Sequence, residues 1–132
     1  LPAAQDAALA TRPRPVPLLA DESARHALSL SALRDRYDLV NVKLDKCGGL
    51  REARATIAGA RALGMGVALG CMVSTSAAIA PAMLLAPLAD LVDLDGSILL
   101  AKDREGRARL DDSGVLHPPA QGLWGWPRRH DS

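Results

Sequence analysis

The stretch Asp38–Leu44, which reads DLVNVKL, decides the fold that we predict for this chain. It is short, its apolar residues are Leu and Val, and the Gly48-Gly49 pair follows closely, which is typical of a buried strand. Residues 50–63 then carry apolar side chains at helical spacing, and Gly64 stands where a helix commonly ends. The stretch therefore predicts a strand that is followed by a helix.

The same alternation of short strand-like runs and longer Ala/Leu-rich runs extends outward in both directions. Strands are expected at residues 16–20, 38–44, 66–71 and 91–94. Helices are expected at 24–36, with Ser23 as the N-cap, and at 50–63 and 75–85. Parallel strands need connections of about a dozen residues, and these helices supply them. We predict an α/β protein with four parallel strands.

The two ends of the chain depart from this alternation. Residues 3–10 look like the end of a helix, and the Pro-rich residues 12–17 look like a turn into the first strand. After the fourth strand, residues 98–101 and 108–110 are expected to pair as a hairpin around 104–106. Residues 114–132 are expected to form a loop that is partly disordered.

Composition excludes several classes of function. The 132 residues are 48% hydrophobic and 23% charged, which suits one packed domain. The formal net charge is +1 and aromatic residues make up 2%, so binding of nucleic acid or of an anionic membrane is not expected. No apolar run approaches the length of a membrane span, and the N-terminus lacks the layout of a signal peptide.

The cysteines and histidines predict no metal site, disulfide framework or nucleophile. Cys47 and Cys71 lack the spacing of a zinc site and have no His/Asn framework, which fits a reducing cytoplasm. His26, His117 and His130 have no spaced partner. The sequence starts at Leu1 rather than at Met, so we expect a piece of a longer protein.

Candidate site residues stand where the predicted strands end, because function in α/β proteins gathers there. Period-2 alternation places Asn41, Lys43 and Asp45 on one face of the second strand. A lysine buried on that face loses protonation and can act as a general base near neutral pH. The alternative is a lysine that reaches solvent or pairs with a carboxylate.

Carboxylates follow the first and fourth strands. In an extended segment Asp21 and Glu22 point to opposite faces, so one of them can face a pocket, either as a ligand of a hard cation or as a helix cap. Asp93 and Asp95 share one face. Such a pair suits a cation site, an ammonium clamp or a coupled acid pair, and the alternative is a turn at Asp95-Gly96.

Four motifs resemble successive strand ends of the enolase superfamily, and most closely its dipeptide epimerases of the L-Ala-D/L-Glu kind in the muconate-lactonizing-like branch. They are PLLADES at 17–23, NVKLDKCGGL at 41–50, GCM at 70–72 and VDLDG at 92–96. The resemblance covers residues 1–123 and implies the C-terminal half of a (β/α)7β TIM-like barrel without its capping domain. Residues 124–132 are expected to form a disordered tail.

This resemblance implies a reaction and a set of roles. A dipeptide would be epimerised at the α-carbon of its C-terminal residue, through an enediolate and with Mg²⁺ as cofactor. Asp21 would be one of three metal carboxylates, and Lys43 one of two lysines that exchange the α-proton. The substrate-binding residues would be Asp93 and Asp95, which hold the ammonium group, together with Cys71 and Met72.

Some features of the family are missing from this sequence. Its Lys-x-Lys strand and its first two metal carboxylates are absent, and Ser97 stands where these epimerases often carry Pro. We therefore expect the chain alone to be inactive. Two alternatives remain open. One is a lyase of the o-succinylbenzoate-synthase or acid-sugar-dehydratase kind, which the paired carboxylates disfavour. The other is a non-catalytic fragment whose open sheet edges pair with another chain, for example in a homo-oligomer.

Overall fold

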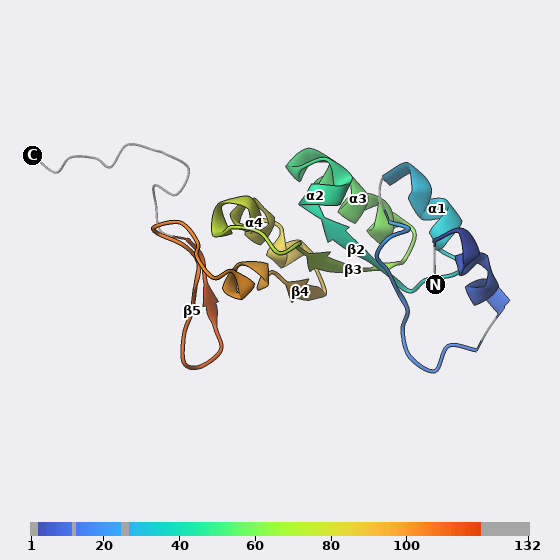
Figure 1. Cartoon of the computed structure of the whole chain (residues 1–132). Coiled ribbons are helices and arrows are strands. Elements are labelled where there is room, and N and C mark those ends of the chain that lie inside the picture. Colours follow the sequence, from blue (N-terminus) through green and yellow to red (C-terminus); the bar gives the residue numbers. More distant parts are fainter. Residues whose placement is uncertain (1–2, 12, 25–26, 120–132) are drawn as a thin grey trace, which may run out of the picture.

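The sheet has four parallel strands in the order β1-β2-β3-β4, as the alternation predicted. The computed structural model describes residues 3–11, 13–24 and 27–119. The strands are β1 (Leu19–Ala20), β2 (Leu39–Lys43), β3 (Gly66–Gly70) and β4 (Leu91–Asp93) (Figure 1). Each lies within its predicted range and is shorter than predicted. The shortfall is largest in β1, because pairing with β2 extends only over Leu19 and Ala20.

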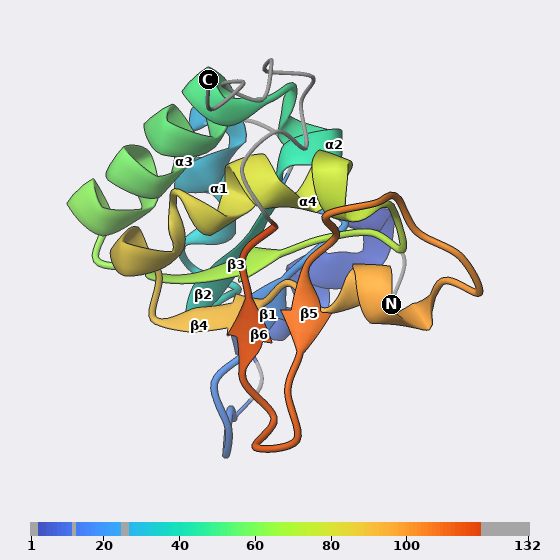
Figure 2. The ribbon, with the colours of Figure 1, turned by 90° about the vertical axis from the view of Figure 1, so that its left-hand side faces the viewer.

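Helices connect the strands and cover one side of the sheet (Figure 2). The α-helices are α1 (Leu30–Leu33), α2 (Leu44–Cys47), α3 (Leu50–Ala62) and α4 (Ser76–Met83). The 3-10 helices are η1 (Ala3–Thr11), η2 (Ala27–Ser29), η3 (Ala86–Leu88) and η4 (Gly96–Leu99). Helix α3 ends as predicted, with Gly64 in the left-handed region at φ +72°.

The core lies between the sheet and these helices. Val40, Val42, Val67 and Leu69 are fully buried and belong to one cluster with Ile57 of α3. Side chains alternate across a strand, so Asn41 and Lys43 lie on the opposite face of β2, as predicted. Asp45 does not share that face. The chain turns into α2 at Leu44, which places Asp45 on an exposed helical position.

The helix predicted over residues 24–36 is replaced by two short pieces, η2 and α1. Ser23 does not cap a helix, because its hydroxyl donates to Asp6 Oδ2 at 2.7 Å. Buried Asp6 also accepts from Arg36 and, at 3.1 Å, from the Tyr37 hydroxyl. The Ser23 hydroxyl, which we predicted to cap a helix, is thus bound to the carboxylate of Asp6 in the N-terminal segment.

The predicted hairpin was wrong in its position. Residues 96–99 form η4, and β5 (Arg109–Leu110) pairs antiparallel with β6 (Leu116–His117). The turn forms at Asp111, whose carboxylate accepts hydrogen bonds from the backbone of Ser113 and Val115, and at Gly114 with φ +83°. The predicted loop at 114–132 is therefore interrupted by β6. The predicted tail at 124–132, His26 and His130 lie outside the described residues.

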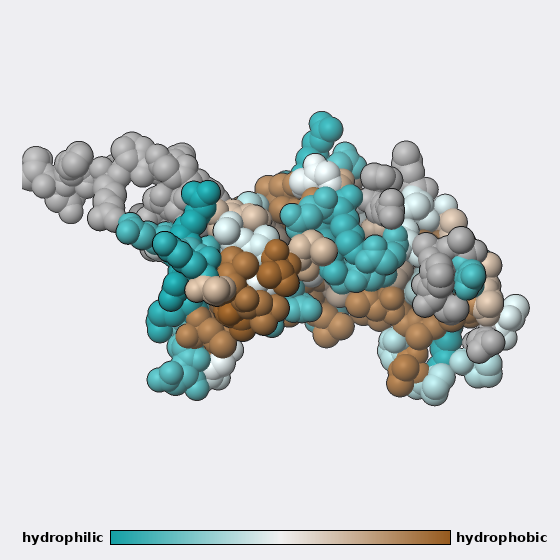
Figure 3. Space-filling view, viewed as in Figure 1, coloured by the Kyte–Doolittle hydropathy of each residue, from teal (hydrophilic) through white to brown (hydrophobic). Residues whose placement is uncertain are grey.

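The surface beside β4 is strongly apolar. Leu91, Val92, Ile98 and Leu99 are all exposed there, and Figure 3 shows hydrophobic residues gathered around β4 and η4. Strand β4 is also an edge of the sheet. In the described ranges no helix combines the length and the apolar character that crossing a membrane requires.

Candidate functional site

The candidate site lies at the carboxyl ends of the four strands. In the sheet register Lys43 of β2 pairs with Gly70 of β3, and Gly70 pairs with Asp93 of β4. Asp21 directly follows β1. Figure 1 shows α2 and α4 starting near the arrowheads of β2 and β3, on the same side of the sheet. Parallel pairing therefore brings Asp21, Lys43 and Asp93 to the same end of the sheet, where the carboxyl ends of the strands lie.

Asp21 lies between two lysines. Its Oδ2 is 3.0 Å from Lys43 Nζ, and its Oδ1 is 2.8 Å from Lys46 Nζ. Lys46 Nζ is also 2.6 Å from Glu22 Oε1. The side chains of Lys43 and Lys46 are 13% and 18% exposed, whereas that of Asp21 is 39% exposed. Lys43 thus pairs with a carboxylate in this structure.

The prediction that only one of Asp21 and Glu22 faces this region was wrong. Both carboxylates bind Lys46. The segment is not extended, because Ala24 N donates to the Asp21 carbonyl and closes a turn. The sequence places Lys46 at the end of the second strand, but we had predicted no role for it. Its position three residues after Lys43, in the first turn behind the strand, was the available signal.

Charges at this cluster are fixed by the ion pairs. Burial raises the pKa of Asp21, but hydrogen bonds from Lys46 and Lys43 outweigh it and hold the pKa below its ordinary value. Burial lowers the pKa of Lys46, whereas Asp21 and Glu22 raise it to a net value above the ordinary one. Asp21 is therefore ionised and Lys46 protonated at neutral pH.

Gly70 makes room for the polar side chains of β2. A Cβ atom at Gly70 would lie 2.5 Å from Asn41 Oδ1 and 3.0 Å from Lys43 Cε. Distances this short exclude any larger residue without a shift of the neighbours. Asn41 Oδ1 is buried and has no hydrogen-bond partner among the described residues.

Asp93 and Asp95 come together, but not through strand alternation. Strand β4 ends at Asp93, and Asp95 has helical backbone angles at the start of η4. Both side chains are exposed and line one open groove, together with apolar residues of the hairpin such as Leu110 and Leu116. Neither carboxylate forms a hydrogen bond or ion pair within the described part of the chain. The pair is thus available to a cationic ligand.

Cys71 and Met72 lie beside this pair because the loops after β3 and β4 are in contact. A Cβ atom at Gly96 would lie 2.5 Å from the Met72 carbonyl oxygen and 2.9 Å from Cys71 Sγ. Met72 is exposed and Cys71 is half-buried. Burial raises the pKa of the Cys71 thiol, and the charges of Asp93 and Asp95 raise it further. Cys71 is therefore a neutral thiol and not a nucleophile at neutral pH.

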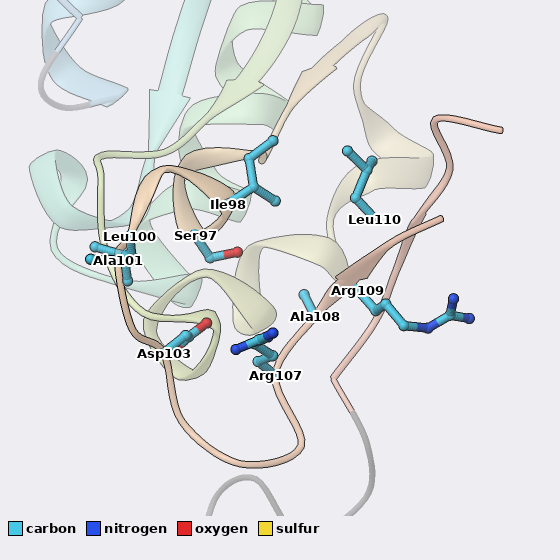
Figure 4. Close-up of a pocket in the computed structure, with 9 residues that line it drawn as sticks. All are labelled: Ser97, Ile98, Leu100, Ala101, Asp103, Arg107, Ala108, Arg109 and Leu110. Carbon is cyan, nitrogen blue, oxygen red and sulfur yellow. The ribbon is translucent and has the colours of Figure 1, made fainter. Parts of the chain in front are cut away.

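A second hollow lies beside η4 and is lined by Ser97, Asp103 and Arg107 among others (Figure 4). Its carboxylate has a structural role. Asp103 accepts the Ser76 hydroxyl at 2.5 Å and the Ser76 backbone N–H at 3.1 Å, which caps the start of α4. Ser76 is fully buried and also accepts the Ala108 N–H at 2.9 Å. This hollow is not the predicted site.

Residues 2–123 match the family described as enolase C-terminal domain-like. The chain belongs to this family. An L-Ala-D/L-Glu epimerase from Escherichia coli is 48% identical over 117 residues, which are 89% of this chain and 36% of the epimerase. An N-acetyl-D-glutamate racemase from Pseudoalteromonas is 46% identical over 125 residues, which are 95% of this chain and 39% of the racemase. The chain thus spans less than two fifths of these curated relatives.

Solved structures agree with the family assignment. An enolase family member from Agrobacterium tumefaciens with homology to dipeptide epimerases, holding sodium and L-Ala-L-Glu, has a TM-score of 0.88 and 46% identity over 95% of this chain and 38% of its own. A dipeptide epimerase from Methylococcus capsulatus, complexed with Mg and L-Arg-D-Lys, has a TM-score of 0.77 and 35% identity over 89% of this chain and 35% of its own. The predicted resemblance and the half-barrel fold are confirmed.

The ends of the described strands offer one candidate metal ligand but not a complete metal site. Asp21 offers carboxylate oxygens, which hard cations prefer. Both of these oxygens are bonded to lysine ammonium groups. No group of three or more His, Cys, Asp or Glu side chains within the described ranges could hold an ion. The described residues therefore fit a role as one part of a magnesium shell, and the remaining ligands are not among them.

Proposed function

We propose that this chain is part of a metal-dependent dipeptide epimerase. The reaction would invert the α-carbon of the C-terminal residue by removing its proton on one face and returning a proton on the other. The juxtaposition of Asp21, Lys43 and the Asp93/Asp95 pair at one sheet edge carries this proposal. Identities of 46% to an N-acetyl-D-glutamate racemase and 48% to an L-Ala-D/L-Glu epimerase support it.

Lys43 is the group that exchanges the α-proton in this proposal. The end of its side chain lies over Gly70 and its Nζ is 3.0 Å from Asp21 Oδ2, so its stem is confined by the neighbouring strand. A restricted acid–base group in a largely buried setting is what proton transfer at carbon requires. Because the chain supplies one such lysine, it serves one face of the α-carbon.

Mg²⁺ is the cation that we propose, with Asp21 as one ligand. When bound, it would stabilise the negative charge that develops on the substrate carboxylate after deprotonation. The Lys46 ammonium, which is itself held by Glu22 at 2.6 Å, donates to Asp21 Oδ1 at 2.8 Å and helps to keep this carboxylate ionised and oriented. The Mg-bound dipeptide epimerase from Methylococcus capsulatus supports this choice of ion.

Asp93 and Asp95 would bind the ammonium group of the dipeptide. The two similar relatives act on substrates that differ in this group, since L-Ala-Glu carries an ammonium and N-acetylglutamate does not. Two exposed carboxylates without partners in the described residues favour the ammonium. N-acetylglutamate racemisation is the second candidate, favoured by the 46% identity to the racemase.

A fused protein tests the choice between these substrates. In the E. coli epimerase, the segment that matches this chain is replaced by residues 2–123. L-Ala-L-Glu and N-acetyl-L-glutamate are then compared at equal concentration with Mg²⁺, and inversion is followed by chiral chromatography. We expect faster inversion of the dipeptide. Faster inversion of N-acetylglutamate would contradict the dipeptide proposal.

We also propose a reducing, cytoplasmic location, which the two unpaired cysteines, Cys47 and Cys71, support.

A further inference from the structure

The side-chain oxygen Oδ1 of Asn41, on β2, is unusual because it is buried without a hydrogen-bond partner among the described residues. A buried amide oxygen without a donor is unfavourable, and native structures contain few of them. The space over Gly70 is shared by this oxygen and the end of Lys43, as the 2.5 Å and 3.0 Å approaches to a Cβ position at Gly70 show. The Lys43 ammonium is therefore a hydrogen-bond donor close to Asn41 Oδ1.

The two lysines on Asp21 are held unequally. Lys46 Nζ contacts two carboxylates, at 2.8 Å and 2.6 Å. Within the described residues, Asp21 Oδ2 at 3.0 Å is the sole hydrogen-bond partner of Lys43 Nζ. A ligand that competes for Asp21 would thus displace Lys43 from Oδ2 more readily than it would displace Lys46 from Oδ1.

We propose that Asn41 is a positioning residue for Lys43, whose ammonium donates to Asn41 Oδ1 whenever Asp21 Oδ2 is taken by another partner. Lys43 then has two hydrogen-bonding positions, one on Asp21 and one on Asn41. Lys46 stays on Asp21 in both states and fixes the orientation of that carboxylate. Gly70 is what allows the second position, because any side chain there would fill the space between Asn41 and Lys43.

The role of this movement of Lys43 in catalysis rests on the proposed function. A cation that binds Asp21 would release Lys43 from an ion pair and transfer it to a neutral acceptor. On the neutral acceptor Lys43 keeps a defined position without the ion pair to Asp21. The exchange itself does not depend on the proposed function, so it can be tested on the chain alone.

Asn41 is the only asparagine in the sequence, which makes it a clean spectroscopic probe. The 132-residue chain labelled with [15N]asparagine gives one side-chain NH2 signal. Asp21→Ala removes the first partner of Lys43. We expect the Asn41 side-chain 15N signal to shift downfield by more than its linewidth, because an ammonium then donates to the amide oxygen.

Two backgrounds control for indirect effects. In Lys43→Met the same Asp21→Ala change should leave the Asn41 signal in place, because no ammonium remains to move. Lys46→Met alone should also leave it in place, because Lys43 keeps Asp21. A shift of equal size in the Lys43→Met background, or no shift in the chain that retains Lys43, would overturn the proposal. Asp21→Ser carries the same comparison if Asp21→Ala does not fold.

The result is independent of the proposed activity. If the Asn41 signal does not shift, the comparison of substrates on the fused protein is still valid. Conversely, the Asn41 shift can be observed even if the fused protein prefers N-acetylglutamate.

Discussion

Lys43 lies over Gly70: the two residues pair in the register of β2 and β3, and a Cβ atom at Gly70 would lie 3.0 Å from Lys43 Cε. The neighbouring backbone therefore limits where the end of Lys43 can go. This relationship links the sheet register to the chemistry, because a one-residue slip would place a side chain where the lysine now lies.

Gly70→Ala should destabilise the chain by about 1–3 kcal/mol, because the new methyl group meets Asn41 and Lys43 in a packed position. Urea unfolding followed by circular dichroism measures this difference. Gly59→Ala is the matched control. It lies within α3, its new methyl would meet only the end of the buried Leu30 side chain, at 3.0 Å, and alanine favours a helix by ~1 kcal/mol over glycine. Equal losses for the two variants would contradict the packing argument.

Asp6→Ala should cost roughly 3–5 kcal/mol of unfolding free energy, since it leaves Arg36 without its buried partner and also frees Ser23 and Tyr37. The same urea experiment applies. Asp112, which is exposed, supplies the control, and Asp112→Ala should change stability by less than about 0.5 kcal/mol.

Acid should destabilise the chain partly through Asp6. The hydrogen bond from Ser23, opposed by burial and reinforced by Arg36 and Tyr37, holds the Asp6 pKa below its ordinary value of 3.8. A carboxyl whose pKa is lower in the folded state stabilises the fold above pH 3.8, and this contribution is lost as the pH falls through the folded pKa. Between pH 7 and pH 3, Asp6→Asn should therefore lose less stability than the parent chain. Parallel losses would show that Asp6 does not contribute.

Ser76→Ala should cost about 1–3 kcal/mol, because it leaves the Ala108 N–H without an acceptor and removes a bond to Asp103. Ser74→Ala is the control, since Ser74 is partly exposed and makes a single 3.3 Å bond to the Met72 carbonyl. We expect thermal unfolding to separate the two variants. If Ser74→Ala proved the more harmful, the capping role of Asp103 would be wrong.

Asp95→Asn in the fused protein should raise the KM for L-Ala-L-Glu by roughly 10- to 100-fold, the value of a hydrogen bond to a charged group. Turnover of N-acetyl-L-glutamate should change little, because that substrate has no ammonium. Asp35→Asn is the control, because Asp35 is exposed and precedes β2, at the other end of the strand from the candidate site. An equal effect on both substrates would mean that Asp95 does not recognise the ammonium.

The local sequence pattern was enough to predict the strands and α3, because the alternation of apolar runs and the glycine at position 64 can be read from residues that are close together in the chain. It also placed Lys43, Asp21 and Asp93 at strand ends, since parallel pairing fixes where those ends meet. The contacts between them needed tertiary structure. Ser23 satisfies a carboxylate 17 residues away, and the space at Gly70 exists only after β2 and β3 pair. The hairpin was misplaced because Asp111 and Gly114 form a better turn than residues 104–106.

Proton exchange in D2O tests whether this chain supplies one face of an epimerase site. The purified 132-residue chain and the fused protein are each incubated with L-Ala-L-Glu and Mg²⁺, and the Glu α-proton and its configuration are followed by NMR and chiral chromatography. We expect inversion with deuterium incorporation by the fused protein, loss of this inversion in the Lys43→Met variant, and no inversion by the chain alone. Inversion by the isolated chain at a rate comparable to that of the fused protein would contradict this expectation.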